Sequence, residues 1–254
     1  MKKSNNFIDY NKSVFAILCI IHLLIFSNTN LLSTDTLEPR MIVFLSDISH
    51  KEHFTGLKTF GINMLFYDEK TIIRDGVENF LGELKNTQVL TITQKSKSAW
   101  RKLTDYDSAR EAIRKFVADG GTIFCDYKSA SNGNDFLFFL GVCGLPWESS
   151  SRANFEDGIS ADENLIPADL SFRGHGGWNE YIRPFKKLLV MKQHPDTAML
   201  LMQENVNGKG RVIYSNLIEF LLWSKNDKMK KLKEKNVETL LNLIFNKKIS
   251  QAHE

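Results

Sequence analysis

The sequence contains little that would assign it to a specialised class of protein. Three cysteines occur in 254 residues, and only Cys125 and Cys143 follow the N-terminal apolar segment, so at most one disulfide is available beyond that segment. The 33 basic and 30 acidic residues leave a formal net charge of +3, a field too weak to indicate a nucleic-acid partner. No apolar run reaches the ~20 residues that a helix needs to cross a bilayer. The sequence shows no internal repeat.

The composition is that of a globular protein with a sizeable core. Hydrophobic residues make up 43% of the chain and charged residues 25%, and 18 phenylalanines are available for the interior. Removal of an N-terminal targeting segment leaves a length typical of a single sheet-based α/β unit. We therefore expect one domain over residues 39–248.

The first 38 residues indicate a targeting signal followed by a linker. Lys2, Lys3 and Lys12 precede an apolar stretch of about 13 residues, Val14–Phe26, which is the layout of a signal sequence. Because this stretch is shorter than a membrane-spanning helix, a cleaved signal is favoured over a permanent anchor, with a buried N-terminal helix as a third alternative. The sequence predicts an exported protein, whether periplasmic, envelope-associated or secreted, that meets a membrane only through this segment.

Apolar runs alternate with helical spacing along the remaining chain. Strands are predicted at Met41–Ser46, Val89–Thr93, Thr122–Tyr127, Leu188–Lys192, Ala198–Met202 and Arg211–Ser215. Helices are predicted from about Lys51 and at Thr71–Lys85, Asp105–Asp119, Asp135–Leu140 and Lys228–Phe245, whereas Ile62–Tyr67 is either a strand or a continuation of the first helix. The spacer Glu204–Gly210 predicts a hairpin turn, and Gly144–Pro184 predicts a long loop. This order predicts an α/β domain with a mainly parallel sheet, helices on both faces, a late β-hairpin and a C-terminal helix.

Three segments carry a resemblance to a known superfamily. Ala109–Ile123 combines a helix, a double glycine and a strand, Asn207–Ser215 combines Gly-Lys-Gly with a strand, and Asn236–Phe245 closes the domain as a helix. In these features the chain resembles class I glutamine-amidotransferase-like domains, including the trehalose-utilisation-protein-like group, over about Met41–Phe245. The resemblance implies a flavodoxin-like α/β sheet.

The resemblance does not extend to the catalytic pair. Catalytic amidotransferases have a nucleophilic cysteine on a glycine-flanked elbow and a late His-Pro-Glu, whereas Cys125 lies between Phe124 and Asp126 inside a predicted strand. The late segment Tyr214–Glu219 contains no histidine. A thiol without an adjacent base is a poor nucleophile, so glutaminase chemistry is not expected and no catalytic residue is assigned. Cys125 is interpreted as a buried structural thiol, with a disulfide to Cys143 or a reactive thiol as alternatives.

Open α/β sheets bind ligands beyond the carboxyl ends of their strands, so the loops there hold the candidate ligand-binding residues. Asp47, His50 and His53 follow the first strand together with Glu52. Two histidines and two carboxylates could supply a divalent metal site, an acid/base pair or another ligand contact, although capping alone also explains polar residues at such a turn. Since the spacing fits no established zinc pattern, the sequence predicts no metal and no cofactor.

A second group of polar residues follows the strand Thr122–Tyr127. Asp126, Lys128, Ser129 and Asn132 could contact a sugar-like or anionic ligand, and they could equally form an ordinary solvent-exposed loop.

The third candidate segment contains Arg173, His175 and Trp178 among glycines. The glycines allow close backbone approach, His175 can transfer protons near neutral pH, and Trp178 could stack on a sugar. A flexible loop with Trp178 packed inward is the alternative. We expect this segment to cover the crevice formed by the other two groups, because Gly144–Pro184 has enough free chain to act as a lid.

The function that these features favour is that of an exported, noncatalytic or small-ligand-binding amidotransferase-like domain with a role in carbohydrate metabolism or envelope assembly. One alternative is a hydrolase or isomerase that acts on a sugar-like substrate through His175 with Asp126 or Asp47. Another is a subunit that only binds another protein.

Export can be tested directly. Because positive charges precede the apolar stretch, we expect the full-length protein to be recovered outside the cytoplasm after fractionation of the cells that produce it. Recovery as a soluble cytoplasmic protein with Met1 or Lys2 still at the N-terminus would contradict this prediction.

Overall fold

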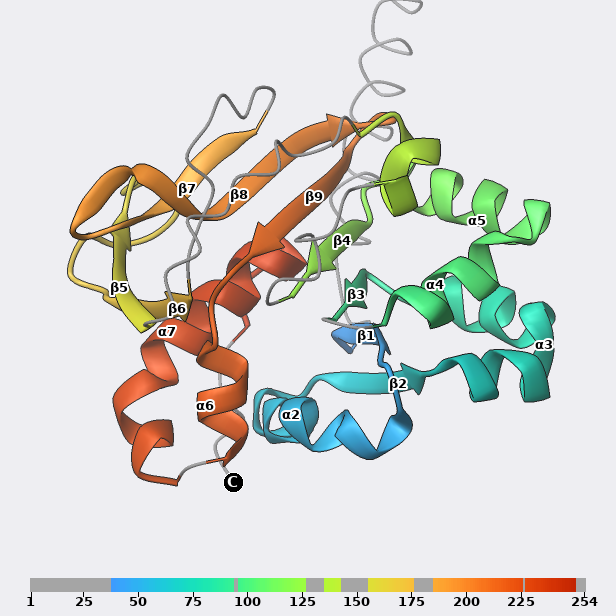
Figure 1. The fold of residues 1–254 in the computed structure, drawn as a ribbon, viewed down its shortest axis with the longest axis horizontal. Helices are drawn as coiled ribbons and strands as arrows, with labels where there is room; N and C mark the ends of the chain where they lie inside the picture. Colours follow the sequence, from blue (N-terminus) through green and yellow to red (C-terminus); the bar gives the residue numbers. More distant parts are fainter. Residues whose placement is uncertain are drawn as a thin grey trace, which may run out of the picture. The chain divides into compact units, whose positions relative to one another are not determined.

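The computed structural model describes residues 38–93, 96–126, 135–142, 155–175, 185–225 and 227–249, and within them one mixed sheet runs through the fold (Figure 1). The strand order is β2-β1-β3-β4-β9-β8-β7-β5-β6. The strands are β1 (Arg40–Phe44), β2 (Asn63–Tyr67), β3 (Val89–Ile92), β4 (Thr122–Cys125), β5 (Phe155–Ser160), β6 (Phe172–His175), β7 (Lys186–Met191), β8 (His194–Val206) and β9 (Gly210–Ser215).

The first half of the sheet is parallel and has the flavodoxin-like order. β1 pairs with β2 and β3, and β4 pairs with β3 and β9, all in parallel. Buried apolar runs predict this half well, because strands covered on both faces need no polar alternation. The predicted α/β fold is confirmed, and Ile62–Tyr67, for which two structures were possible, contains strand β2.

The second half is antiparallel and joins the first through β9. β8 pairs with β9 across the predicted hairpin, whose turn has positive φ at Asn205, Asn207 and Gly208. β7 pairs with β8 and β5, and β5 pairs with β6. The prediction of one long loop over Gly144–Pro184 is wrong, because β5 and β6 lie within it. These strands mix polar and apolar residues, so their local sequence has only a weak preference for the extended conformation. Pairing with strands distant in the sequence determines their structure instead.

The outermost strand, β6, turns back onto the chain that follows β9. Gly174 forms an antiparallel bridge with Leu217, and the amide of Ile218 donates to the carbonyl of Arg173 at 3.0 Å. A side chain at position 174 would overlap the carbonyl oxygen of Asn216 and the side chain of Met199, so this approach requires glycine. The antiparallel strands therefore curl until the last of them meets the start of the following helical segment.

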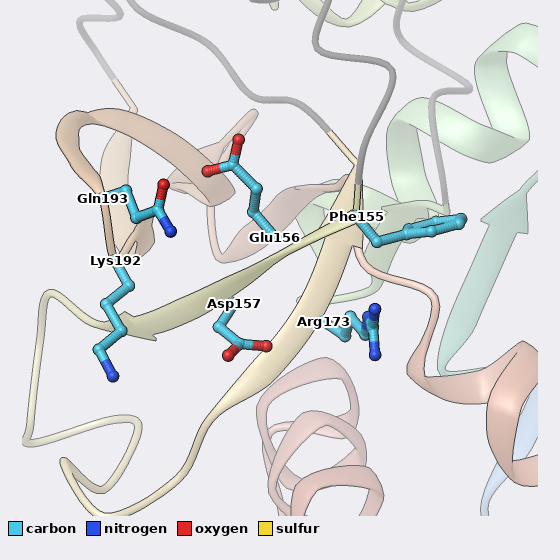
Figure 2. A pocket seen from close by; sticks show the side chains of 6 residues that line it. All are labelled: Phe155, Glu156, Asp157, Arg173, Lys192 and Gln193. Atoms are coloured by element: carbon cyan, nitrogen blue, oxygen red, sulfur yellow. The ribbon is translucent and has the colours of Figure 1, made fainter.

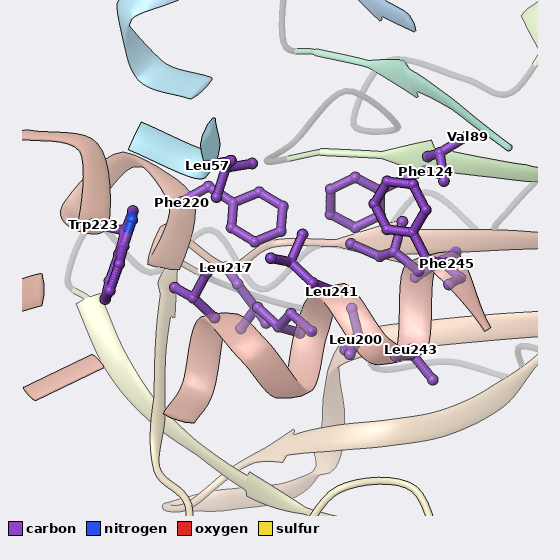
Figure 3. Packing of buried hydrophobic residues seen from close by; sticks show 14 of the residues in the cluster. Leu57, Val89, Phe124, Leu200, Leu217, Phe220, Trp223, Leu241, Leu243 and Phe245 are labelled. Atoms are coloured by element: carbon purple, nitrogen blue, oxygen red, sulfur yellow. The ribbon is translucent and has the colours of Figure 1, made fainter. Parts of the chain in front are cut away.

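Helices cover both faces of the sheet, as predicted. The elements are η1 (Ile48–Lys51), α2 (Glu52–Thr55), η2 (Gly56–Phe60), α3 (Glu69–Leu84), α4 (Lys97–Thr104), α5 (Asp107–Ala118), η3 (Asp135–Leu140), α6 (Glu219–Lys225) and α7 (Asp227–Phe245). One buried cluster lies between the sheet and α3, α4, α5 and η3. The other lies between the sheet and α2, η2, α6 and α7 (Figure 3). No helix in the described ranges is long and apolar enough to span a membrane.

The helical predictions differ from the structure mainly where helices are short. The helix expected from Lys51 is a chain of three short turns that ends at Gly61, whose φ is +68°. Asp135–Leu140 is a 3-10 helix. Helices α4 and α6 were not predicted, since segments of eight and seven residues are too short to show a helical period.

The contact between β9 and α5 yields a stability prediction. A methyl group at Gly210 would overlap the carbonyl oxygen and side chain of Val117, whereas a methyl group at Gly82 in α3 would meet no atom within 4 Å. We expect Gly210→Ala to lower the free energy of unfolding by about 1–3 kcal/mol through overpacking. The matched control, Gly82→Ala, should raise it by about 0.5–1 kcal/mol, because alanine favours a helix interior. Urea unfolding of both variants measures this, and equal effects would contradict the prediction.

Candidate functional site

The turn that follows β1 contains three of the predicted site residues. Asp47 caps η1 by accepting a hydrogen bond from the amide of Ser49 at 2.9 Å. The hydrogen bonds from Ser49 lower the pKa of the Asp47 carboxyl group below its ordinary value. Asp47 therefore has the capping role that was one of the interpretations of this turn.

His50 and His53 lie beside each other in the same turn. Their ring centroids are 6.0 Å apart, and Nδ1 of His50 is 3.1 Å from Oγ of Ser46. The carbonyl of His53 accepts a hydrogen bond from Ser224 in α6 at 2.8 Å, which ties this turn to the helix that follows β9. Among the described residues, no three His, Cys, Asp or Glu side chains are grouped closely enough to hold a metal ion.

The end of β4 contains Cys125 and Asp126. Cys125 is 1% exposed and is in register with Ile92 and Tyr214, so its thiol lies within the sheet rather than on an elbow. The amide of Asp126 donates to the carbonyl of Ile92 at 2.9 Å, which extends the ladder by one residue. Lys128, Ser129, Asn132, Trp178 and Cys143 lie outside the described residues.

Arg173 lines a pocket at the antiparallel end of the sheet. The pocket has a volume of about 240 Å³. Its lining comes from β5, β6 and the β7–β8 turn, and consists of Phe155, Glu156, Asp157, Arg173, Lys192 and Gln193 (Figure 2). Of these, the sequence predicted only Arg173, and as part of a loop rather than of strand β6. His175 ends the same strand, next to Phe155 of β5 in the register.

Charged side chains of opposite sign alternate across this pocket. Asp157 lies between Lys192 and Arg173, and Phe155 extends past Arg173 (Figure 2). Asp157 and Arg173 are direct cross-strand partners, and the amide of Lys192 donates to the carbonyl of Asp157 at 2.9 Å. Within the described part of the chain, no ion pair joins these three side chains. They are exposed and available to a ligand.

The backbone of Arg173 is anchored from the interior by Glu219, the first residue of α6. Glu219 is 1% exposed, and its Oε1 accepts a hydrogen bond from the amide of Arg173 at 2.5 Å. Lys233 of α7 forms an ion pair with the same oxygen at 3.4 Å and donates to the carbonyl of Ser171 at 3.1 Å. Asn236 also donates to Ser171, at 2.8 Å. Two helices thus hold the strand that carries Arg173.

The carboxyl group of Glu219 is held in an unfavourable environment for its charge. Burial raises its pKa, and the nearby Lys233 ammonium group and the hydrogen bond from Arg173 oppose that rise. Its second oxygen, Oε2, is buried and has no hydrogen-bond partner among the described residues. Glu219 follows the carboxyl end of β9, so the same rule that favours the loops after the other parallel strands could have identified it. Its local sequence gives no further signal, because a single glutamate at the start of a helix is also an ordinary helix-terminus residue.

The structure brings some predicted residues together and separates others. Asp47, His50 and His53 share one turn, and Arg173 belongs to the pocket. Asp47, His50, His53 and Asp126 do not line that pocket. Asp157 and Lys192 do line it, but the sequence around them did not predict a site, because only the strand register places them beside Arg173.

Comparisons with known proteins give similarities to solved structures only. No family model matches the sequence, and no curated protein matches it. A glutamine amidotransferase aligns with a TM-score of 0.47 at 14% identity, over 81% of this chain and 98% of that one. A putative ThuA-like protein from Bacteroides uniformis ATCC 8492 aligns with a TM-score of 0.42 at 15% identity, over 78% of this chain and 97% of that one.

A further similarity involves a larger enzyme. A β-galactosidase from Bacillus circulans sp. alkalophilus aligns with a TM-score of 0.45 at 13% identity, over 82% of this chain. This chain spans 32% of that enzyme and 34% of another β-galactosidase, Gan42B.

The buried carboxyl group of Glu219 predicts a specific pH dependence of stability. Because the folded protein binds the Glu219 proton more tightly than the unfolded chain, the wild type loses stability as the pH rises from the ordinary carboxyl range through the raised pKa. Glu219→Gln keeps an acceptor for the Arg173 amide but cannot titrate. We expect the stability of the variant relative to wild type to increase as the pH rises from the ordinary carboxyl range through the raised pKa of Glu219. Urea unfolding across this range measures the difference.

The matched control is Glu78→Gln, since Glu78 is exposed in α3. The difference in the free energy of unfolding between this variant and the wild type should change little with pH. The prediction would be contradicted if the stability of Glu219→Gln relative to wild type stayed constant or fell as the pH rises.

Proposed function

We propose that the chain is an exported, noncatalytic member of the amidotransferase-like superfamily that binds a small, sugar-like ligand in the β5–β6 pocket. The observation that carries the proposal is the convergence of Asp157, Arg173 and Lys192 on one pocket without ion pairs among them. Small-ligand sites combine a concave surface with a few polar groups that fix orientation. Charged side chains that the fold does not use for its own contacts are suited to that task.

The pocket also provides an apolar surface. Phe155 is 45% exposed, although a phenyl ring gains free energy when it is covered. It is the diagonal neighbour of Arg173 across the two strands, so an apolar face and hydrogen-bonding groups lie within reach of one ligand. A sugar ring has both kinds of surface, which supports the sugar-like assignment.

The environment of Cys125 supports a noncatalytic assignment. The thiol is buried within β4, beside Tyr214, whereas a nucleophilic cysteine needs an exposed turn and a nearby base. The late segment supplies Glu219 but no histidine. Activity on glutamine through Cys125 is therefore not part of the proposal.

Membership of the superfamily rests on the segments that carry the resemblance. Ala109–Ile123 forms most of α5 and the start of β4, and Asn207–Ser215 forms the hairpin turn and β9. The amide of Lys209 donates to the carbonyl of Ala118 at 3.1 Å, so the Gly-Lys-Gly segment docks on the end of α5. Export rests on the N-terminal apolar stretch, and a role in the cell envelope would follow from that location.

Ligand binding can be tested with a panel of monosaccharides and the full-length protein. We expect at least one sugar or sugar acid to shift the backbone amide NMR signals of β5, β6 and the β7–β8 turn, because those elements line the pocket. Shifts confined to other elements, or none with any member of the panel, would contradict the proposal. Cys125→Ser serves as a control for thiol chemistry. It should bind the same sugar with unchanged affinity, and loss of a sugar- or glutamine-dependent activity in this variant would show that Cys125 is catalytic.

A further inference from the structure

The charged side chains that line the β5–β6 pocket balance one another. Two carboxylates, Glu156 and Asp157, are present together with two cations, Arg173 and Lys192. Asp157, Arg173 and Lys192 are exposed, and Glu156 is half-buried. A ligand with a net charge of either sign would therefore meet two like charges as well as two opposite ones. The lining thus favours a ligand whose own charges sum to zero.

Asp157 and Arg173 form an adjacent pair of opposite charges within this lining. They are direct partners across β5 and β6, which places their Cβ atoms about 4.5–5.5 Å apart on one face of the sheet (Figure 2). Within the described part of the chain, no ion pair joins the two side chains. A ligand can therefore contact a carboxylate and a guanidinium group side by side.

The backbone that carries this pair is fixed by hydrogen bonds. The amide of Arg173 donates to Glu219 and its carbonyl accepts from Ile218, so β6 is bonded at this residue on the side away from β5. The carbonyl of Asp157 accepts a hydrogen bond from the amide of Lys192. Because these bonds hold the backbone before a ligand arrives, less conformational entropy is lost on binding.

From this arrangement we infer that the pocket selects a zwitterionic sugar, a ring that bears one ammonium group and one carboxylate. The inference rests on the proposed function and names the ligand class for the same pocket. The guanidinium group of Arg173 matches the carboxylate of the ligand with two parallel hydrogen bonds, and Asp157 accepts hydrogen bonds from the ammonium group. The strand register places these two partners close enough to meet adjacent substituents of one ring.

The remaining lining residues fit the rest of such a ligand. Glu156 and Lys192 supply a second charge of each sign, so a bound zwitterion leaves the pocket without excess charge. Phe155 offers its exposed ring to the C–H face of the sugar, and Gln193 offers both a donor and an acceptor to its hydroxyl groups. The pocket volume of about 240 Å³ suits one monosaccharide unit.

The test measures the affinities of the full-length protein for compounds that differ in charge. Muramic acid carries both charges on a sugar ring, D-glucosamine only the positive one, D-glucuronate only the negative one and D-glucose neither, whereas glycine carries both without a ring. The measurements are made at fixed ionic strength and about pH 7, where carboxyl groups are ionised and amino groups of this kind are mostly protonated. We expect muramic acid to bind about tenfold or more tightly than each of the others, because it alone combines charge-assisted contacts of both signs with a ring.

Two variants should change the charge preference in opposite directions. Arg173→Gln leaves an excess of negative charge in the lining, so it should weaken muramic acid binding about tenfold and make D-glucosamine bind more tightly than D-glucuronate. Asp157→Asn leaves an excess of positive charge, so it should weaken muramic acid binding by a similar factor and make D-glucuronate bind more tightly than D-glucosamine. Lys192→Gln carries the same expectation as Arg173→Gln if that variant does not fold.

Matched controls make the same changes of net charge outside the pocket. Lys58→Gln in η2 removes one positive charge, and Asp105→Asn at the end of α4 removes one negative charge, both from exposed residues. Both controls should leave every affinity unchanged, because exposed charges far from a ligand are screened by salt.

The outcomes distinguish the two proposals. If D-glucose, D-glucosamine or D-glucuronate bound as tightly as muramic acid, the zwitterion inference would be overturned and the proposed function would stand. The same charge preference in both pocket variants, or equal losses of affinity in the pocket variants and the controls, would also overturn the inference. Absence of binding by every sugar, or binding of glycine as tight as that of muramic acid, would overturn both proposals.

Discussion

Strand β9 has two different kinds of neighbour, and the rest of the sheet depends on its ability to pair with both. It is parallel to β4 on one edge and antiparallel to β8 on the other. All six of its residues are buried, so it also needs cover on both faces. Arg211 secures this position because its guanidinium group donates to Thr122, to the carbonyl of Ile244 and to Asn246. One buried side chain thereby links β9 to β4 and to the end of α7.

Glu219 and Lys233 likewise use buried polar contacts to hold a strand of the antiparallel half, β6. Burial of a carboxylate with one oxygen that has no partner among the described residues costs free energy, and the ion pair with Lys233 returns only part of it. What the arrangement provides is position, because the carboxylate fixes β6 at Arg173. The pocket residues on the outer face therefore depend on a polar contact inside the protein.

Sequence patterns predicted the parts of the fold that are specified locally. The runs at Met41–Ser46 and Thr122–Tyr127 identify strands of the parallel half, because burial on both faces leaves an unbroken apolar signature. Strands β5 and β6 have no such signature, since one face of each is exposed and their pairing is specified by distant strands. For the same reason the residues around Arg173 could not be predicted. The turn of Asp47, His50 and His53 could, because those residues are neighbours in sequence.

The bridge between Gly174 and Leu217 also affects how the protein meets other chains. A strand at the margin of a sheet ordinarily exposes unpaired amide and carbonyl groups that can recruit a strand from another molecule. On β6, Arg173 and Gly174 already pair with residues 217–219, so that margin is shielded by the chain itself. Within the described residues, β2 is the other terminal strand, and it pairs with β1 alone. Among the described strands, the margin without a pairing partner is thus that of β2, at the opposite end of the sheet from the pocket.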